Sequence, residues 1–204
     1  MATIGNDVTE QITSEDDLLR SIMQEHVITN EFNREYAPLA TIQPSIAIVF
    51  TVKITNDLSL DLNNSRLHVI AKIIKADEMN IDANTAAPIN LTLNSMFVEI
   101  GLEFNGRNVN DTSQLHPYRS VLEILLNFFK EVQETRLSSD GWTKDTSGHM
   151  NITAVGGNNA GLNARVATFA RSTLVELINR FHLDVFYQER LIPPNIDLYM
   201  KLIL

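Results

Sequence analysis

Phe97-Val-Glu-Ile-Gly-Leu-Glu-Phe104 is the segment from which the fold of this 204-residue chain is most directly argued. Apolar residues alternate with Glu and Gly along it, so every second residue from Val98 to Phe104 lies on one apolar face. An alternation of period two is typical of a half-buried β-strand. Asn105-Gly106 follows directly, and both residues tolerate the positive φ that a two-residue hairpin turn requires. The segment therefore predicts a strand that ends in a tight turn.

A helix is predicted after this turn. Pro117 fits the first turn of a helix, where the missing N–H has no intrahelical partner in any case. From Tyr118 to about Glu134 apolar residues recur at helical spacing, namely Val121, Leu122, Leu125, Leu126, Phe129 and Val132. Tyr118 and Arg119 are interpreted as anchors of the helix start, with Tyr118 under the sheet and Arg119 paired with a carboxylate or a carbonyl.

Further strands are predicted on both sides of this region. Pro44 opens one whose inward face is Ile46, Ile48, Phe50, Val52 and Ile54, and Asn56-Asp57 ends it. The segment from Leu67 to Ile74 is apolar on both faces, which indicates a central strand or one covered by another element. Three more strands are predicted near the C-terminus, at Thr173–Ile178, His182–Tyr187 and Ile196–Leu204.

Two long loops connect these elements. Asp77–Pro88 is predicted to be one of them. The other, Ser138–Leu162, is rich in Gly, Asn, Ser and Thr, and we expect it to be exposed, flexible and the first site of proteolysis. A short helix should follow it, with Leu162, Val166 and Phe169 aligned on one face.

Residues 1–43 are predicted to form an N-terminal arm with a short helix, and residues 44–204 a single domain. Ser14 and Asp17 resemble a helix cap. A short apolar stripe follows, made of Leu18, Leu19, Ile22 and Met23. The stripe serves either core packing or docking on a neighbouring subunit.

The composition is that of a globular chain with an acidic surface. The net charge is −9 and Lys and Arg do not cluster, which disfavours direct sequence-specific binding of nucleic acid and binding to anionic membranes. The absence of cysteine excludes disulfides, thiolate nucleophiles and Cys-ligated metals. No apolar run approaches the ~20 residues of a membrane-spanning helix, and the polar N-terminus does not match a signal peptide.

The serines and glycines show no catalytic pattern. Gly156-Gly-Asn-Asn-Ala-Gly161 precedes a predicted helix, but it lacks the Gly-Lys-Ser/Thr ending of a phosphate-binding loop, so we interpret it as a flexible loop. Ser120 and Ser172 lack the glycine-flanked elbow of a hydrolase.

The histidines are scattered, and no pair has the spacing of a helical zinc site; they are His26, His68, His116, His149 and His182. His68 and His182 are expected on strands, as packing or surface residues. His149 beside Asp145 could ligate an ion, and so could the acidic loop of Asp77, Glu78 and Asp82, although the EF-hand spacing is missing. We predict no enzyme and no catalytic, cofactor-binding or metal-binding residue.

Eight segments between Leu58 and Leu204 carry a resemblance to a known family. They are Asp61–Asp77, Pro88–Asn90, Leu93–Phe97, Phe104–Arg107, Pro117–Asn127, Trp142–Gly148, Phe181–Glu189 and Ile196–Leu202. In this order they resemble the major capsid proteins of Maverick/Polinton virus-like transposable elements and their adintovirus relatives, which are hexon-like double jelly-roll proteins. Such capsid proteins are much longer, so this chain is similar to their first jelly roll only.

The resemblance implies both a fold and a function. The fold would be all-β, a jelly-roll β-sandwich of two antiparallel sheets with inserted helices over residues 44–204. The function would be structural: one jelly roll of a capsid subunit, with three subunits forming a capsomer of an icosahedral shell. The expected partners are the second jelly roll and neighbouring subunits. The expected location is the virion, and the host cell interior before assembly.

Two other classes stay open, because the jelly-roll fold hosts several functions. A ligand- or carbohydrate-binding module would need a concave aromatic patch, and the one tryptophan, Trp142, is predicted in a loop beside Lys144. A cupin-like metalloenzyme would need histidines and a carboxylate that converge in space, and the order of the chain does not bring such residues together.

The sequence also predicts which residues are buried. Six should point between the two sheets: Ile48, Phe50, Val69, Ile100, Leu102 and Leu198. Phe50→Ala should then cost about 3–5 kcal/mol. Leu191-Ile192 and the final strand lack polar cover, and the chain ends within that strand, which suggests truncation. We therefore expect an exposed apolar patch there, covered in the assembly by a second jelly roll beyond Leu204 or by an adjacent subunit.

Overall fold

The computed structural model describes residues 30–43, 46–55, 58–110 and 114–204. Within the described part, Tyr36–Leu204 belongs to one compact unit. The predicted N-terminal helix and the strand-bounding residues Pro44, Asn56 and Asp57 lie outside the described residues.

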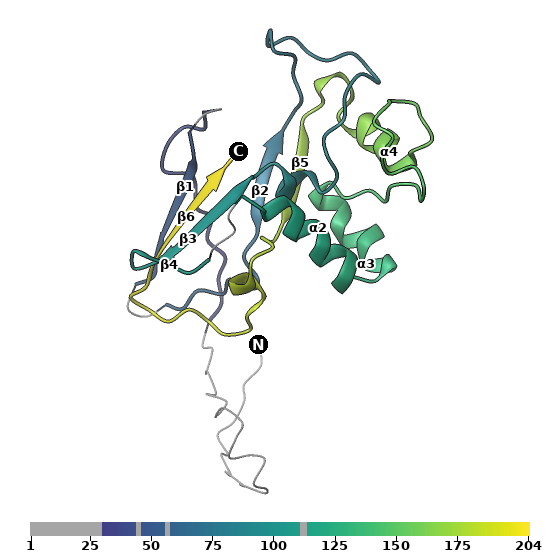
Figure 1. The fold of residues 1–204 in the computed structure, drawn as a ribbon. Coiled ribbons are helices and arrows are strands. Elements are labelled where there is room, and N and C mark those ends of the chain that lie inside the picture. Colours follow the sequence, from purple (N-terminus) through teal and green to yellow (C-terminus); the bar gives the residue numbers. More distant parts are fainter. Residues whose placement is uncertain (1–29, 44–45, 56–57, 111–113) are drawn as a thin grey trace, which may run out of the picture. The chain divides into compact units, whose positions relative to one another are not determined.

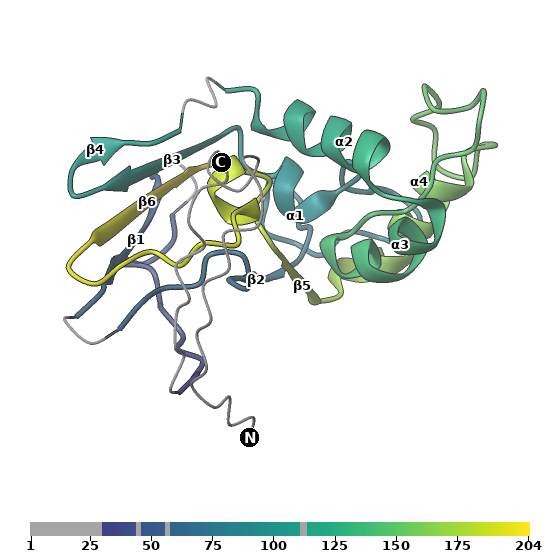
Figure 2. The same ribbon diagram turned by 90° about the horizontal axis from the view of Figure 1, so that it is seen from below.

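A four-stranded antiparallel sheet is the larger of two sheets (Figures 1 and 2). Its strands, in spatial order, are β1 (Ile48–Lys53), β6 (Asp197–Ile203), β3 (Glu99–Phe104) and β4 (Arg107–Asn108). The C-terminal strand β6 therefore lies between β1 and β3. Its three inward residues, Leu198, Met200 and Leu202, are buried, so the expectation that the final strand is exposed is wrong.

The register of the large sheet places the alternate apolar residues of its strands together. Ile100 lies opposite Leu202, and Met200 lies opposite Leu102 on one side and Phe50 on the other. Paired residues point to the same face of a sheet, so these side chains build one apolar surface. Val98 departs from the predicted face and is 41% exposed, because it precedes β3, whereas its neighbour Phe97 is buried.

The hairpin between β3 and β4 confirms the turn predicted from Asn105-Gly106. Asn105 has φ 48° and Gly106 has φ 74°, and Phe104 pairs with Arg107 directly across the turn. The Asn105 side chain also accepts a hydrogen bond of 2.8 Å from the Asp197 N–H. The turn therefore fixes the start of β6 as well as closing its own hairpin.

The second sheet has two antiparallel strands, β2 (Leu67–Ala71) and β5 (Val175–Asn179). Val69 pairs with Leu177 on the inward face, and Ile70 pairs with Glu176 on the outward face. Ile70 is 62% exposed. The prediction that this strand is central or covered is wrong for the part of the chain that the structure describes, because β2 pairs only with β5 there.

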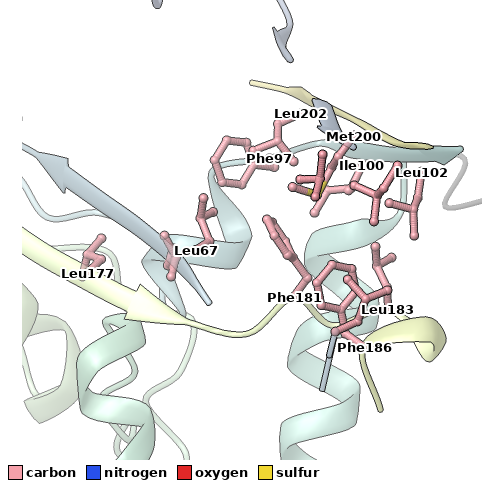
Figure 3. Packing of buried hydrophobic residues seen from close by; sticks show 14 of the residues in the cluster. Leu67, Phe97, Ile100, Leu102, Leu177, Phe181, Leu183, Phe186, Met200 and Leu202 are labelled. Carbon is pink, nitrogen blue, oxygen red and sulfur yellow. The ribbon is translucent and has the colours of Figure 1, made fainter. Parts of the chain in front are cut away.

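One hydrophobic core contains residues of both sheets (Figure 3). Figure 3 shows Phe181, Leu183 and Phe186 on one side of this core and the residues of β3 and β6 on the other. The six residues predicted to point inward, Ile48, Phe50, Val69, Ile100, Leu102 and Leu198, all belong to it, which confirms the predicted register. Phe50 is only half-buried, so its truncation should cost less than the predicted amount.

Helices and 3₁₀ turns connect the strands, so the all-β prediction is wrong and the fold is mixed α/β with two antiparallel sheets. The helices are α1 (Thr92–Ser95), α2 (His116–Asn127), α3 (Lys130–Thr135) and α4 (Ala160–Thr168). The 3₁₀ turns are η2 (Arg136–Asp140), η3 (Ala170–Ser172) and η4 (Asp184–Tyr187). In the described residues no helix combines the length and apolarity that crossing a membrane would demand.

Two predicted elements differ from the observed ones. The helix predicted to run to Glu134 breaks at Phe128 and Phe129, whose ψ angles of 127° and 158° are extended. The Gln133 side chain stabilises the break, because its amide donates to the carbonyl oxygens of Ile124 and Phe128. The strand predicted at His182–Tyr187 is the turn η4, closed by a hydrogen bond from the Phe186 N–H to the Leu183 carbonyl.

The predicted loop Ser138–Leu162 is packed at its beginning. Trp142 is buried beside Leu137 and Ile124, and Asp140 is fully buried. Most side chains from residue 147 to residue 158 are exposed. We therefore expect limited proteolysis to cut within 147–158 rather than near Trp142.

The helix that follows this loop confirms its prediction. α4 contains the aligned residues Leu162 and Val166 and ends beside Phe169, and the last two are buried. As predicted, Asp77–Pro88 contains neither helix nor strand. Asn80, within this loop, forms an isolated β-bridge with Ile74, which lies just before it.

Candidate functional site

Helix α2 presents one face to its own chain and a second face to solvent. Pro117 lies in its first turn, as predicted. The inner face consists of His116, Ser120 and Ile124, at i, i+4 and i+8, all with 0% exposure. Ile124 packs against Leu91 and Trp142 in a small second core. His116 and Ser120 are therefore buried polar residues in the first turns of α2, and buried polar groups require hydrogen-bond partners.

Asp140, at the end of η2, is the most deeply buried carboxylate among the described residues that form this site. It accepts hydrogen bonds of 2.9 Å from Asn94 Nδ2 and 2.9 Å from Asn179 Nδ2. Burial raises the pKa of Asp140 to about 6, although these amide donors and the nearby His182 partly oppose the rise. Asp140 therefore joins α1, η2 and the end of β5 through one side chain.

His116 is the second buried titratable group. Its Nε2 lies 3.3 Å from Asn94 Oδ1 and 3.4 Å from Ser120 Oγ. Burial lowers the pKa of His116 to about 4, and the positive charges of His182 and Arg119 contribute to the decrease. Its Nδ1 is buried and makes no hydrogen bond. His116 is therefore a neutral side chain near pH 7.

A third group links α2 to η4. His182 Nδ1 lies 2.8 Å from Glu123 Oε2 and 2.8 Å from the Tyr187 hydroxyl. Burial opposes ionisation of Glu123, but hydrogen bonds from His182 and Arg119 outweigh it, so the pKa of Glu123 is lowered. Burial also raises the pKa of the Tyr187 hydroxyl, with the Glu123 charge adding to the effect. The Arg180 guanidinium stacks 4.3 Å from the centre of the Tyr187 ring.

The two residues predicted to anchor the start of α2 behave differently. Arg119 confirms its prediction: it pairs with Glu123 at 3.0 Å and with Asp184. Tyr118 contradicts its prediction, because it is 71% exposed instead of packed under the sheet. At i+1 from Pro117, Tyr118 lies on the side of α2 away from the buried residues His116 and Ser120.

Titratable residues from distant parts of the sequence approach one another around α2. His116 and Glu123 belong to α2, His182 follows β5 and contacts Glu123, and Asp140 ends η2 and contacts Asn94 of α1. Their donors and acceptors are largely paired within the chain. No group of three or more metal-ligating side chains forms among the described residues. The arrangement holds α2 in place rather than presenting a reactive group to solvent.

The outer face of α2 is the most apolar exposed surface in this region. Tyr118, Leu122, Leu125 and Leu126 of α2, together with Leu115 just before the helix and Phe129 just after its end, form what we call the α2 seam. Exposure ranges from 56% for Leu125 to 81% for Phe129. A shallow, open depression on this surface is lined by Leu115, Tyr118, Leu122 and Leu126 together with Arg119 and Glu123. The sequence had identified Leu122, Leu125, Leu126 and Phe129 as part of a helical apolar series without showing what covers them.

Exposed apolar side chains also lie on or beside the outward face of β2 and β5, interspersed with His68 and Glu176. Ile70, Leu174 and Ile178 are 62%, 67% and 44% exposed, and we call them the β2–β5 outer face. An ion pair of 2.8 Å between His68 and Glu176 lies on the same face. His68 is thus a surface residue of a strand, as predicted. His182 lies beyond the end of β5 and is buried.

The glycine-rich segment before α4 binds its own chain. The Asn159 side chain accepts hydrogen bonds from the N–H groups of Gly161 and Leu162, so the helix N-terminus is capped. A Cβ on Gly161 would lie 2.6 Å from Asp145 Oδ1, which explains why a residue without a side chain stands there. Asp145 pairs with Arg165 at 3.1 Å. The carboxylate considered as a partner of His149 is therefore used to hold α4.

The remaining candidates stay separate from the site. In the acidic loop Asp82 pairs with Lys75 at 3.3 Å, and the Asp77 side chain accepts from the Met79 N–H. Ser172 Oγ accepts a hydrogen bond of 2.9 Å from the Ile81 N–H. These contacts close loops.

Comparisons with protein-family models, with curated proteins and with solved structures found no match to this chain.

Proposed function

We propose that this chain is a structural protein, a building block that associates with copies of itself and with neighbouring subunits to form a capsid shell. The observation that carries the proposal is the presence of two separate apolar surfaces, the α2 seam and the β2–β5 outer face. Exposed apolar patches beyond scattered residues are typical of protein contact surfaces. One such surface makes a closed pair, whereas two different surfaces allow an extended lattice.

The pairing of the strands supports a jelly roll as the origin of the fold. The first described strand, β1, pairs with the last, β6, and the second, β2, pairs with the next to last, β5. This nested order arises when a long antiparallel ribbon is wrapped into two sheets, as in a jelly roll. The inserted helices α1 to α4 replace parts of that ribbon. The resemblance to the first jelly roll of Maverick/Polinton and adintovirus capsid proteins points the same way.

A role in ligand binding has less support from the described residues. The carbohydrate-binding alternative needed an exposed aromatic platform, and Trp142 is 7% exposed inside the small core under α2. His182 contacts Glu123, whereas His116 and Asp140 both contact the Asn94 side chain, so these groups have partners within the chain. In the proposed capsid the chain would act in the virion, after accumulation inside the host cell.

Negative-stain microscopy of the full coding product tests this function. Hexagonal capsomers or closed shells are the expected particles, because the resemblance implies trimers of subunits that each carry two jelly rolls. Variants Ile70→Glu and Leu122→Glu each place a charge in one apolar surface and should reduce the yield of shells. Isolated single subunits at every concentration of the native product would contradict the proposal.

A further inference from the structure

We propose that Arg66 and Arg180 together form a binding site for an oxyanion, which is the carboxylate or phosphate group of a ligand. The site lies at one end of the two-stranded sheet, where Arg66 precedes β2 and Arg180 follows β5. It uses neither the α2 seam nor the β2–β5 outer face, so the inference is independent of the proposed function.

The pairing of β2 with β5 brings the two arginines together. Leu67 pairs with Asn179 at this end of the sheet, so the adjoining residues Arg66 and Arg180 lie opposite each other. Arg66 Nη1 donates a hydrogen bond of 2.9 Å to the Asn63 carbonyl oxygen, and Arg180 Nη1 lies 3.5 Å from the same oxygen. Two guanidinium groups therefore converge on one neutral acceptor.

No paired carboxylate balances these two positive charges. Among the described residues, no Asp or Glu forms an ion pair with Arg66 or Arg180. Burial and the charge of Arg180 lower the pKa of Arg66, and the charge of Asp61 only opposes this decrease. The Asp61 carboxylate itself accepts from the backbone N–H and the side-chain amide of Asn64. Because like charges that face each other across a sheet are destabilising, a bound anion would relieve a cost that the fold already carries.

The Arg180 guanidinium is held in place before any ligand arrives. It stacks on the Tyr187 ring, 4.3 Å from the ring centre. Its Nη1 also donates to Asn63 Oδ1 and lies 3.5 Å from the Phe186 carbonyl oxygen. A donor group that is already oriented loses less conformational entropy on binding, which favours affinity.

The donors that remain on the two arginines indicate the class of ligand. All hydrogen bonds from Arg66 and Arg180 to the described residues use Nη1, so Nε and Nη2 of each have no acceptor there. Arg66 is exposed, and Nε and Nη2 of the half-buried Arg180 are open to solvent. The edge of a guanidinium that carries Nε and Nη2 binds two oxygens of a carboxylate or a phosphate at once. Two such edges close together fit an oxyanion.

A titration of the full-length chain followed by NMR tests the site. The Nε–H resonances of Arg66 and Arg180 should shift and saturate with inorganic phosphate, with a dissociation constant on the order of millimolar. Sodium chloride at the same ionic strength should leave them in place. Saturation by acetate as well would assign the site to carboxylates and phosphates alike, and saturation by phosphate alone would assign it to phosphate groups. Resonances that respond to neither anion beyond the chloride control would overturn the proposal.

Arg66→Gln is the most informative variant, because Arg66 is exposed and its replacement should leave the fold intact. Phosphate should bind this variant at least tenfold more weakly than the native chain. Arg66→Lys should also bind more weakly, because it keeps the charge and loses the fork of donors. The matched control is Arg107→Gln, which removes an exposed arginine of β4 and should bind phosphate like the native chain.

Urea unfolding separates a ligand site from a purely structural role of Arg66. Phosphate stabilises folded proteins in general, because it is excluded from their surfaces. The readout is therefore the difference between chains in phosphate and in chloride of equal ionic strength. Phosphate should raise the unfolding midpoint of the native chain and of Arg107→Gln more than that of Arg66→Gln. Equal gains in all three chains would overturn the proposal and leave Arg66 with a structural role in the turn before β2.

Discussion

Phe97→Ala should lower the free energy of unfolding by about 3–5 kcal/mol, the cost of truncating a fully buried aromatic residue. Phe97 is 2% exposed and lies in the short connection between α1 and β3. Figure 3 shows its ring beside Leu202 of β6, where α1 meets the large sheet. Removing the ring leaves a cavity between two elements that cannot easily close it. Equilibrium unfolding in urea measures the change.

Phe129→Ala is the matched control for this substitution. The same side chain is removed, but Phe129 is 81% exposed in the α2 seam. The free energy of unfolding of the monomer should change by no more than about 0.5 kcal/mol, as for ordinary surface substitutions. Equal destabilisation by both variants would contradict the core described above.

Asp140→Asn should change the pH dependence of stability by about 2 kcal/mol between pH 4.5 and pH 6.5. The pKa of Asp140 is raised from 3.8 to about 6 in the folded chain. In this window the folded chain keeps the Asp140 proton that the unfolded chain has lost. The carboxyl therefore makes the protein less stable as the pH rises, and the substitution removes this loss.

His116 acts in the opposite direction over the same window. Its pKa is lowered from 6.5 to about 4, so the unfolded chain binds a proton that the folded chain does not. Stability from His116 thus rises with pH and offsets the loss from Asp140, so these two groups together should add little net pH dependence in this window. The lowered pKa of Glu123 removes stability only at lower pH, as that pKa is approached from above.

Urea unfolding at pH 4.5, 5.5 and 6.5 tests these opposed effects. Asp140→Asn should become more stable relative to the native chain as the pH rises, because only the His116 effect remains. One oxygen of the asparagine can still accept from Asn94 and Asn179, so the variant should fold. Asp82→Asn, in an exposed loop, should run parallel to the native profile. A parallel profile for Asp140→Asn would show that this carboxyl is not buried in the folded chain.

The strands could be predicted because each one is encoded by the alternation of apolar and polar residues within its own segment. The alternation along β1, β3 and β6 sets which residues face the core, and Asn105-Gly106 encodes its turn through the two positive φ angles. An alternation of period two shows which residues share one face of a strand, but it does not show which element packs against that face. The pattern of β2 therefore could not show that its second apolar face, with Ile70, lies open to solvent.

The candidate site was missed because its residues are distant in the sequence. Asn94, Asp140 and Asn179 meet only after α1, η2 and β5 pack together. The α2 seam was visible as a helical stripe, but periodicity does not reveal what covers an apolar face. On the other side of the helix, the i, i+4, i+8 series of His116, Ser120 and Ile124 was the available sign that α2 buries a different face.

Static light scattering of the native chain over a range of concentrations tests the central claim, that this protein assembles through two apolar surfaces. The chain mass is 22.9 kDa, and the measured mass should rise with concentration beyond that of a dimer. Leu122→Glu and Ile70→Glu should each stop growth at small species, and the double variant should remain monomeric. A native chain that stays at the monomer mass throughout would contradict the claim and argue for a self-contained module.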